Sequence, residues 1–198
     1  MNLLLAAVIG YLIGGIPTGI WVSHAVRGVD PRTLGSGSSG ATNVSRVLGR
    51  KWAIVVLLLD ALKGFLPAAF ISLLLVGTAN LIHVKIALAF GAVLGHVFTP
   101  YARFRGGKGI ATAAGAMAAL DPVALGIALL VWLLLFALFR RVSVASLAAA
   151  ITLPGAIILL GGRPLSLIVA GVTIFLFLVF THRENIQRLL AHQEQPLV

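Results

Sequence analysis

The sequence predicts an all-α integral membrane protein with seven transmembrane helices, its N-terminus outside and its C-terminus in the cytoplasm. Composition is the first reason: of 198 residues, 60% are hydrophobic and 10% are charged, which excludes a water-soluble domain. Apolar runs that alternate with short polar segments are the second reason. The third is the one-sided distribution of Lys and Arg among those segments. Because no linker or low-complexity segment divides the chain, we expect residues 1–198 to form a single domain.

The apolar runs predict the individual helices. A run of about 20 residues crosses the hydrocarbon layer. The first run has neither a basic start nor a clear cleavage site, so we expect it to be retained as a spanning helix. The fourth run is short, which suits either a thin span or a re-entrant hairpin. The expected spans are residues 1–26, 52–76, 81–101, 110–120, 123–139, 142–160 and 165–180.

The positive charges decide whether the fourth run crosses the membrane. If it does, twelve Lys and Arg residues of the loops share one side and only Arg163 lies opposite. If it does not, the division is nine against four. Cytoplasmic loops carry the excess of Lys and Arg, so the first arrangement is favoured and gives seven spans. The net charge of +10 is then explained by membrane orientation and phosphate binding, and no nucleic acid partner is expected.

Two features inside the spans predict contacts between helices. Asp60 and Lys63 are three residues apart and can neutralise one another on one helix face. A structural clamp is favoured for this pair, although charged pairs within spans are also candidates for function. Gly91 and Gly95 form a pair of small residues that allows close backbone approach, and packing is the expected role.

The glycine–lysine loop, residues 103–109, is the strongest candidate for an anion site. Its sequence RFRGGKG joins three glycines to three positive charges just before the fourth apolar run. Glycines let backbone N–H groups turn toward a common point, and a helix beginning after Gly109 would direct its own N–H groups there. A cytoplasmic loop that is basic only because such loops usually are remains the open alternative.

The serine–glycine loop, residues 35–40, has the sequence GSGSSG and matches the dinucleotide pattern G-x-G-x-x-G. We reject a dinucleotide site because no strand precedes the glycines. Hydroxyl and N–H donors instead suit a phosphate or a polyol, and Arg46 is a possible bidentate partner for phosphate oxygens. A solvated turn is the alternative.

A polar tail follows the last apolar run. At helical spacing His182, Asn185 and Arg188 share one face, which suits a hydroxylated anion. A tail whose basic side chains extend to the membrane interface is the alternative. With seven spans, this tail, Ser143 and the two glycine-containing loops are all expected at the same membrane face.

The residue types that the sequence lacks argue against several kinds of catalysis. The chain has five acidic residues and no clustered carboxylates for magnesium, so we expect neither a metal nor a cofactor. The absence of cysteine excludes thiol nucleophiles. No histidine is followed by Asp at the x4 spacing that common acyltransferases use to activate a hydroxyl.

Three segments together resemble the bacterial acyl-phosphate-dependent glycerol-3-phosphate acyltransferases, the PlsY family. They are GSGSSGATNVSR at 35–46, GHVFTPYARFRGGKGIAT at 95–112 and HRENIQRL at 182–189, and the resemblance extends over nearly the whole chain. One departure is Ser38, where the family usually has Asn, so an amide contact is not implied at that position.

The resemblance implies transfer of a fatty acyl group from acyl phosphate to the sn-1 hydroxyl of glycerol 3-phosphate. It implies a monomer in the bacterial inner membrane, in contact with lipid, whose active site faces the cytoplasm. Either His182 or a substrate phosphate oxygen would take the hydroxyl proton, and the phosphate is favoured. The expected catalytic residues are Ser36, Arg46, Lys108, His182 and Asn185. The expected substrate-binding residues are Gly35, Gly37, Asn43, Gly106, Gly107, Gly109, Ser143 and Arg183.

A transporter for an organic phosphate is the alternative function. Such a protein needs polar residues through the middle of the bilayer, and beyond Asp60 and Lys63 the spans offer few. A scaffold subunit is a third possibility, and it predicts loops indifferent to substitution.

Overall fold

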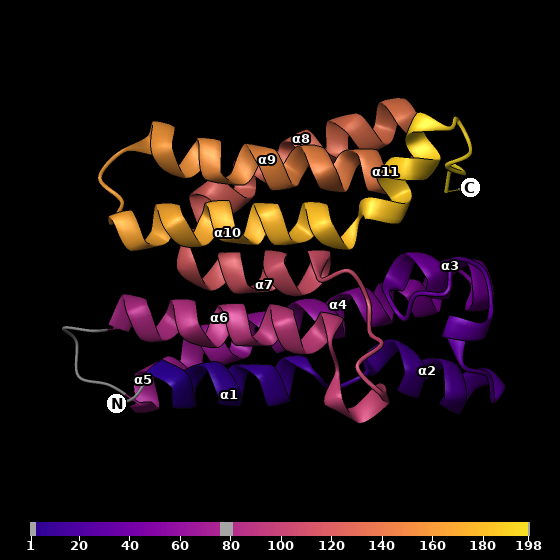
Figure 1. The fold of residues 1–198 in the computed structure, drawn as a ribbon, viewed down its shortest axis with the longest axis horizontal. Helices are drawn as coiled ribbons and strands as arrows, with labels where there is room; N and C mark the ends of the chain where they lie inside the picture. The colour runs from indigo at the N-terminus through magenta and orange to yellow at the C-terminus, as the bar shows by residue number, and fades with distance from the viewer. Residues whose placement is uncertain (1–2, 76–80, 198) are drawn as a thin grey trace. The chain divides into compact units, whose positions relative to one another are not determined.

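The computed structural model describes residues 3–75 and 81–197, and within these ranges every regular element is a helix (Figure 1). The all-α fold is therefore confirmed for the described residues. The α-helices are α1 (Leu3–Gly14), α2 (Thr18–Arg27), α3 (Ala41–Leu48), α4 (Arg50–Leu66), α5 (Ser72–Leu75), α6 (Leu81–Val97), α7 (Ile110–Leu120), α8 (Pro122–Phe139), α9 (Val142–Leu160), α10 (Leu165–Thr181) and α11 (Arg183–Leu190). The short elements are η1 (Pro31–Thr33), η2 (Pro67–Ile71) and η4 (Pro100–Ala102).

Several helical segments have the length and composition of a membrane span. Within the described residues five meet both conditions, and α10 with α11 makes a sixth if the pair, bent by 60°, counts as one. The five are Leu3–Arg27, Arg50–Leu74, Leu81–Ala102, Pro122–Phe139 and Val142–Leu160. The expected fourth span is α7, whose 11 residues are too short to meet the length condition. Val76, the expected end of the second span, and the first two residues of the chain lie outside the described residues.

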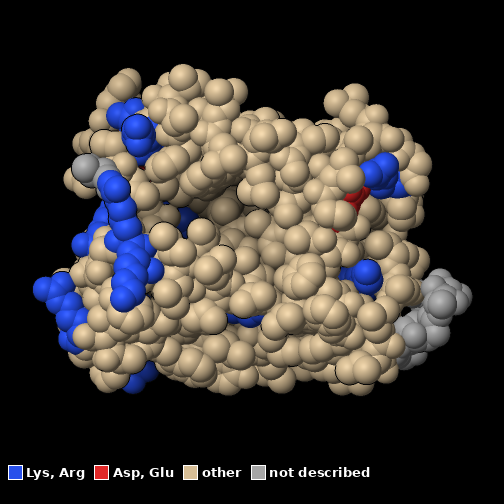
Figure 2. All heavy atoms as spheres, turned by 180° about the vertical axis from the view of Figure 1, so that it is seen from behind, with Lys and Arg blue, Asp and Glu red and all other residues tan. Residues whose placement is uncertain are grey.

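The surface agrees with a protein that sits in lipid. Large apolar side chains on the long helices are exposed, for example Leu130 at 68% and Leu159 at 88%. On the face drawn in Figure 2, Lys and Arg gather mainly near the helix ends, and other residues cover the surface between them. Exposed apolar side chains of this density are typical of a lipid-facing surface.

The helices form two compact units, Met1–Leu120 and Asp121–Val198. The first contains α1 to α7 and the second α8 to α11. The single domain stays a prediction.

Glycines bring the helices of the first unit into close contact. α1 packs along α6, and α4 packs along α7 (Figure 1). A Cβ on Gly91 would collide with the carbonyl of Ala7, and one on Gly95 with the carbonyl of Tyr11. The predicted packing role of this glycine pair is therefore confirmed.

The first expected span is broken between α1 and α2. Gly15 to Pro17 interrupts it, because Pro17 has no N–H to continue the helix. Lys63 Nζ donates to the carbonyl oxygen of Ile16 at 2.8 Å and forms an ion pair of 2.8 Å with Asp60 Oδ1. The same carboxylate oxygen accepts a hydrogen bond from the Thr18 hydroxyl. The predicted Asp60–Lys63 pair is confirmed, and it clamps α4 to the break in the first span.

The second unit consists of three long helices and a bent end. α8 packs on α9 and α9 on α10, and α11 leaves α10 at 60°. Asp121 caps α8 by accepting from Ala124 N at 3.0 Å, and it pairs with Arg163 at 2.9 Å. This pair joins the start of α8 to the α9–α10 loop. Since α8, α9 and α10 run up and down, the start of α9 and the end of α10 lie together at the other end of the unit.

Candidate active site

Asn43 organises the serine–glycine loop in the first unit. Its side chain is 1% exposed, and its Oδ1 accepts from Ser36 N at 2.8 Å. Its Nδ2 donates to the carbonyl oxygens of Pro31 (2.7 Å), Leu34 (3.1 Å) and Ser38 (2.8 Å). One buried amide on α3 therefore fixes the backbone around Ser36, because buried polar groups must be satisfied within the protein. The direct substrate contact expected for Asn43 stays a prediction.

The glycines of the serine–glycine loop fit tightly around Asn43. Gly35 and Gly37 have φ of +57° and +72°, where glycine is favoured. A Cβ on Gly35 would collide with Asn43 Oδ1 and lie 3.9 Å from Arg46 Cδ. Gly35, Ser36 and Arg46 are therefore neighbours, and Arg46 is exposed on α3. Ser38, where the family usually has Asn, accepts from Gly40 N through its hydroxyl at 3.2 Å.

The glycine–lysine loop runs from η4 to the start of α7. Gly109, with φ of +87°, precedes α7, and its carbonyl oxygen accepts from Ala113 N at 2.8 Å. Lys108 is half-buried next to this helix start. The expected helix after Gly109 is confirmed, and a helix N-terminus favours a nearby anion.

Two N–H groups of this loop have a different use from the one we expected. Gly106 N donates to the Val97 carbonyl oxygen at 2.9 Å, and Gly107 N donates to that of His96 at 3.2 Å. These bonds satisfy carbonyls at the end of α6, so in this conformation the two groups do not point to a common anion. A Cβ on Gly106 would collide with the His96 carbonyl, and one on Gly107 with the His96 imidazole. Close approach to α6 explains both glycines, and their place in a substrate-binding loop stays a prediction.

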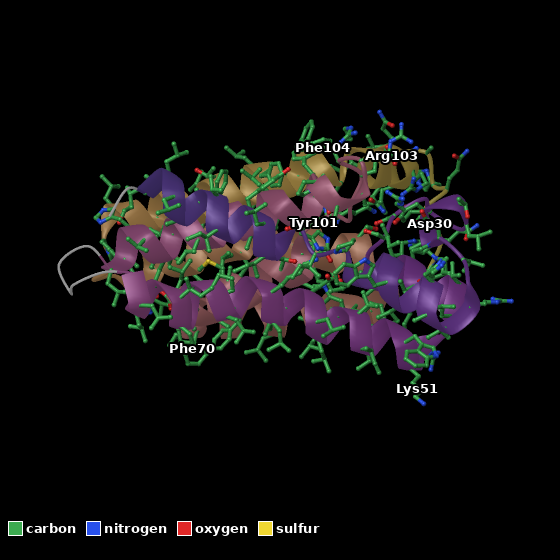
Figure 3. All side chains as sticks on the ribbon, turned by 90° about the horizontal axis from the view of Figure 1, so that it is seen from below. Asp30, Lys51, Phe70, Tyr101, Arg103 and Phe104 are labelled. Atoms are coloured by element: carbon green, nitrogen blue, oxygen red, sulfur yellow. The ribbon has the colours of Figure 1, made fainter. Side chains whose placement is uncertain are left out.

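Arg32 lies in η1, before the serine–glycine loop, and joins this segment to η4 and the glycine–lysine loop. Its Nη1 donates to the carbonyl oxygens of Ala102 (2.8 Å) and Arg105 (3.0 Å), and its Nη2 pairs with Asp30 at 2.6 Å. The Arg32 hydrogen bond holds the pKa of the Asp30 carboxyl below its ordinary value. Asp30 and Arg103 lie at the same end of the unit (Figure 3). This link was not predicted from the sequence, where the only signal was Asp before Pro at the start of a short helix.

In the second unit, Ser143 and Asn185 share one partner. Ser143 Oγ and Asn185 Nδ2 each donate to Glu194 Oε1 at 2.7 Å, and Arg188 Nε donates to Glu194 Oε2 at 2.7 Å. The predicted shared face of Asn185 and Arg188 on α11 is therefore confirmed. Glu194 was not among the expected site residues, and nothing in the tail sequence marked it.

His182 lies where α10 ends, and it is 3% exposed. Its Nδ1 is 2.8 Å from the carbonyl oxygen of Leu178. Because a carbonyl oxygen only accepts, Nδ1 carries the hydrogen in the neutral ring and Nε2 holds the lone pair. Arg183 instead turns back along α10, with its Nη1 3.2 Å from the Phe180 carbonyl oxygen and its guanidinium 4.7 Å from the Phe180 ring. That placement is typical of an interfacial arginine, and a substrate contact for Arg183 stays a prediction.

Comparison with known proteins identifies the family. A model of the glycerol-3-phosphate acyltransferase family matches residues 4–192. Glycerol-3-phosphate acyltransferases of Myxococcus xanthus and Aquifex aeolicus are 44% and 39% identical to this chain. The alignments cover 94% and 98% of this chain, and 95% and 98% of those proteins.

Solved structures agree with this result. The crystal structure of PlsY, an integral membrane glycerol 3-phosphate acyltransferase, in its glycerol 3-phosphate form is 35% identical with a TM-score of 0.91, covering 100% of this chain and 96% of that one. Its lysophosphatidic acid form gives 35% and 0.88, with coverage of 99% and 95%. The three motifs, the helical fold and these matches together show that the chain belongs to the glycerol-3-phosphate acyltransferase family, the PlsY family.

Proposed function

We propose that this protein transfers a fatty acyl group from acyl phosphate to the sn-1 hydroxyl of glycerol 3-phosphate. The hydroxyl oxygen bonds to the acyl carbon, the bond from that carbon to phosphate oxygen breaks, and the hydroxyl proton passes to phosphate. The products are lysophosphatidic acid and inorganic phosphate. The observation that carries this proposal is the family match over residues 4–192, which includes all three polar motifs.

The chain offers donors suited to both substrates. We assign the catalytic roles to Ser36, Arg46, Lys108, His182 and Asn185, with Ser143 as a further contact to glycerol 3-phosphate. The glycine–lysine loop, with Lys108 beside the start of α7, suits the phosphate of the acyl donor. Gly35, Gly37 and Asn43 support Ser36, because Asn43 fixes that loop. Gly106, Gly107 and Gly109 shape the other loop.

The chemistry requires little activation. An acyl phosphate is already an activated donor with a good leaving group, so positioning and charge stabilisation carry the rate. Holding hydroxyl and carbonyl in attack geometry supplies roughly 7–11 kcal/mol in the best cases. Each donor aimed at the developing charge is worth roughly 10²-fold or more. No metal ion or organic cofactor is needed for this mechanism.

The proton has two routes. A phosphate oxygen of a substrate is the favoured acceptor, because it lies in the reacting complex. The alternative is His182, whose Nδ1 contact with Leu178 leaves the lone pair on Nε2. A carbonyl, unlike a carboxylate, gives little stabilisation to an imidazolium, which favours the phosphate.

The expected topology completes the proposal. Seven spans, with α7 as the thin fourth one, put twelve loop Lys and Arg residues on the cytoplasmic side against Arg163 outside. The protein would then be one polytopic domain of the bacterial inner membrane, active as a monomer in lipid, with its site at the cytoplasmic face.

Substitution of the two phosphate-binding cations tests the assignment. With purified protein in proteoliposomes, Arg46→Ala and Lys108→Ala are expected to abolish acyl transfer to glycerol 3-phosphate without loss of membrane insertion. Arg50→Ala is the control, because Arg50 is an exposed cation near Arg46 and has no proposed role. Near-normal turnover in both variants refutes the assignment, and substrate uptake without product supports the transporter instead.

A further inference from the structure

The C-terminal tail, residues 191–197 after α11, folds back on the junction between α8 and α9. Arg141 Nε donates to the Glu194 carbonyl oxygen at 3.0 Å, and Leu197 N donates to the Arg140 carbonyl oxygen at 2.7 Å. The end of α11 adds a hydrogen bond from Gln193 N to the Arg188 carbonyl oxygen at 2.7 Å. These contacts place the Glu194 side chain within hydrogen-bond distance of Ser143, Asn185 and Arg188.

The carboxylate of Glu194 is held as a buried anion. It is 8% exposed and accepts three side-chain hydrogen bonds of 2.7 Å. Burial alone would raise the pKa of Glu194, but hydrogen bonds from Arg188, Ser143 and Asn185 outweigh it and hold the pKa below its ordinary value. The group is therefore negatively charged at neutral pH.

The three donors around Glu194 match the chemistry of a phosphate monoester. A hydroxyl, an amide N–H and a guanidinium N–H suit phosphate oxygens as well as carboxylate oxygens. The proposed function also places Ser143 and Asn185 in contact with glycerol 3-phosphate. A hydrogen already donated to Glu194 is not available to a substrate.

We propose that Glu194 is a tethered competitor of glycerol 3-phosphate, and that the tail inhibits the enzyme until substrate phosphate displaces the carboxylate. This inference rests on the proposed function, since it assumes that Ser143 and Asn185 bind substrate. A tethered group competes at an effective concentration of the order of mM when its linker is short. The apparent affinity for substrate equals the intrinsic affinity multiplied by the fraction of molecules whose site is open.

Few side chains of the tail would have to leave a buried position for it to undock. Among residues 191–196, Glu194 is the buried one, and the other five are exposed. Hydrogen bonds at the edge of a structure exchange readily for bonds to water, so undocking mainly requires another anion to replace the carboxylate.

Steady-state kinetics tests the competition. Glu194→Gln keeps the size of the side chain, removes its charge and places an amide donor against Arg188 or Asn185. The KM for glycerol 3-phosphate is expected to fall about tenfold, the ratio that corresponds to ~1.4 kcal/mol. Gln195→Ala, an exposed neighbour, is the matched control and should leave KM unchanged. An unchanged or raised KM in Glu194→Gln overturns the inference.

A second measurement leaves Glu194 in place. The chain has no cysteine, so Gln195→Cys carries a single fluorescent probe on the tail. Glycerol 3-phosphate or inorganic phosphate, added without an acyl donor, is expected to lower the probe's anisotropy as the tail leaves. An unchanged anisotropy at saturating glycerol 3-phosphate overturns the inference. Failure of the unmodified chain to transfer an acyl group overturns the proposed function instead, so the two failures are distinguishable.

Discussion

Asn43 Oδ1 accepts a 2.8 Å hydrogen bond from the backbone N–H of Ser36, seven residues earlier in the chain. The same side chain holds three carbonyl oxygens through its Nδ2. This single amide therefore gives the serine–glycine loop its shape, and it makes the position of Ser36 dependent on a residue that is itself buried.

Asn43→Asp is expected to disable the loop. The substitution puts a carboxylate oxygen where Nδ2 now donates to carbonyls, so contacts at 2.7 and 2.8 Å become repulsive. Unsatisfied buried groups cost about 1–3 kcal/mol each, more when charged. Acyl transfer should fall at least 10²-fold while insertion persists, as measured by turnover and by the yield of membrane-extracted protein. Turnover near that of the unmodified chain would show that Ser36 does not depend on this contact.

Gly107→Ala is expected to displace the glycine–lysine loop. A Cβ there would collide with the imidazole of buried His96, and a shift of about 1 Å in a catalytic group can cost 10²-fold in rate. Gly126→Ala on α8 is the control, because a Cβ there meets nothing within 4 Å. The rate at saturating substrates should drop only in Gly107→Ala. Equal rates in the two variants would contradict the role of the loop.

Acidification is expected to release the C-terminal tail. Docking lowers the Glu194 pKa below its ordinary value, so docking is fully favoured above that ordinary value and weakens as pH falls through the lowered pKa. The charged groups facing Glu194 are Arg188 from α11 and Arg141 at the start of α9. The anisotropy of the probe at Gln195→Cys should therefore decrease at acid pH. Adding Glu194→Gln should abolish this transition, and a transition that persists would assign it to another group.

Labelling from one side of the membrane tests the predicted topology. Single cysteines at Arg103 and Gln187, both exposed, are expected to react with an impermeant thiol reagent from the cytoplasmic side. A cysteine at exposed Leu165, next to Arg163, should react from the outside. Reaction of the Arg103 and Gln187 positions from opposite sides would exclude one shared substrate site.

The helices and the local polar contacts could be predicted from the sequence because they depend on short-range patterns. Apolar runs gave the long helices, and a three-residue spacing gave the Asp60–Lys63 pair. The break before α2 was missed, since Gly15 to Pro17 lies inside an otherwise continuous apolar run.

Contacts that depend on the folding of distant segments could not be predicted. Arg32 reaches Ala102, 70 residues away, and Glu194 reaches Ser143, 51 residues away. Neither contact follows from a regular spacing in the sequence, because the partner of a loop residue depends on the backbone path of the folded chain. The sequence also suggested that the N–H groups of Gly106 and Gly107 could bind an anion. In the structure they donate to carbonyl oxygens at the end of α6.

Donor specificity tests the central claim most directly. Purified protein is incubated with glycerol 3-phosphate and, in parallel, with acyl phosphate, acyl-CoA or acyl-carrier protein of the same chain length. Lysophosphatidic acid and one equivalent of inorganic phosphate are expected with acyl phosphate alone. Product from either thioester donor at a comparable rate, or none from acyl phosphate, would contradict the proposed reaction.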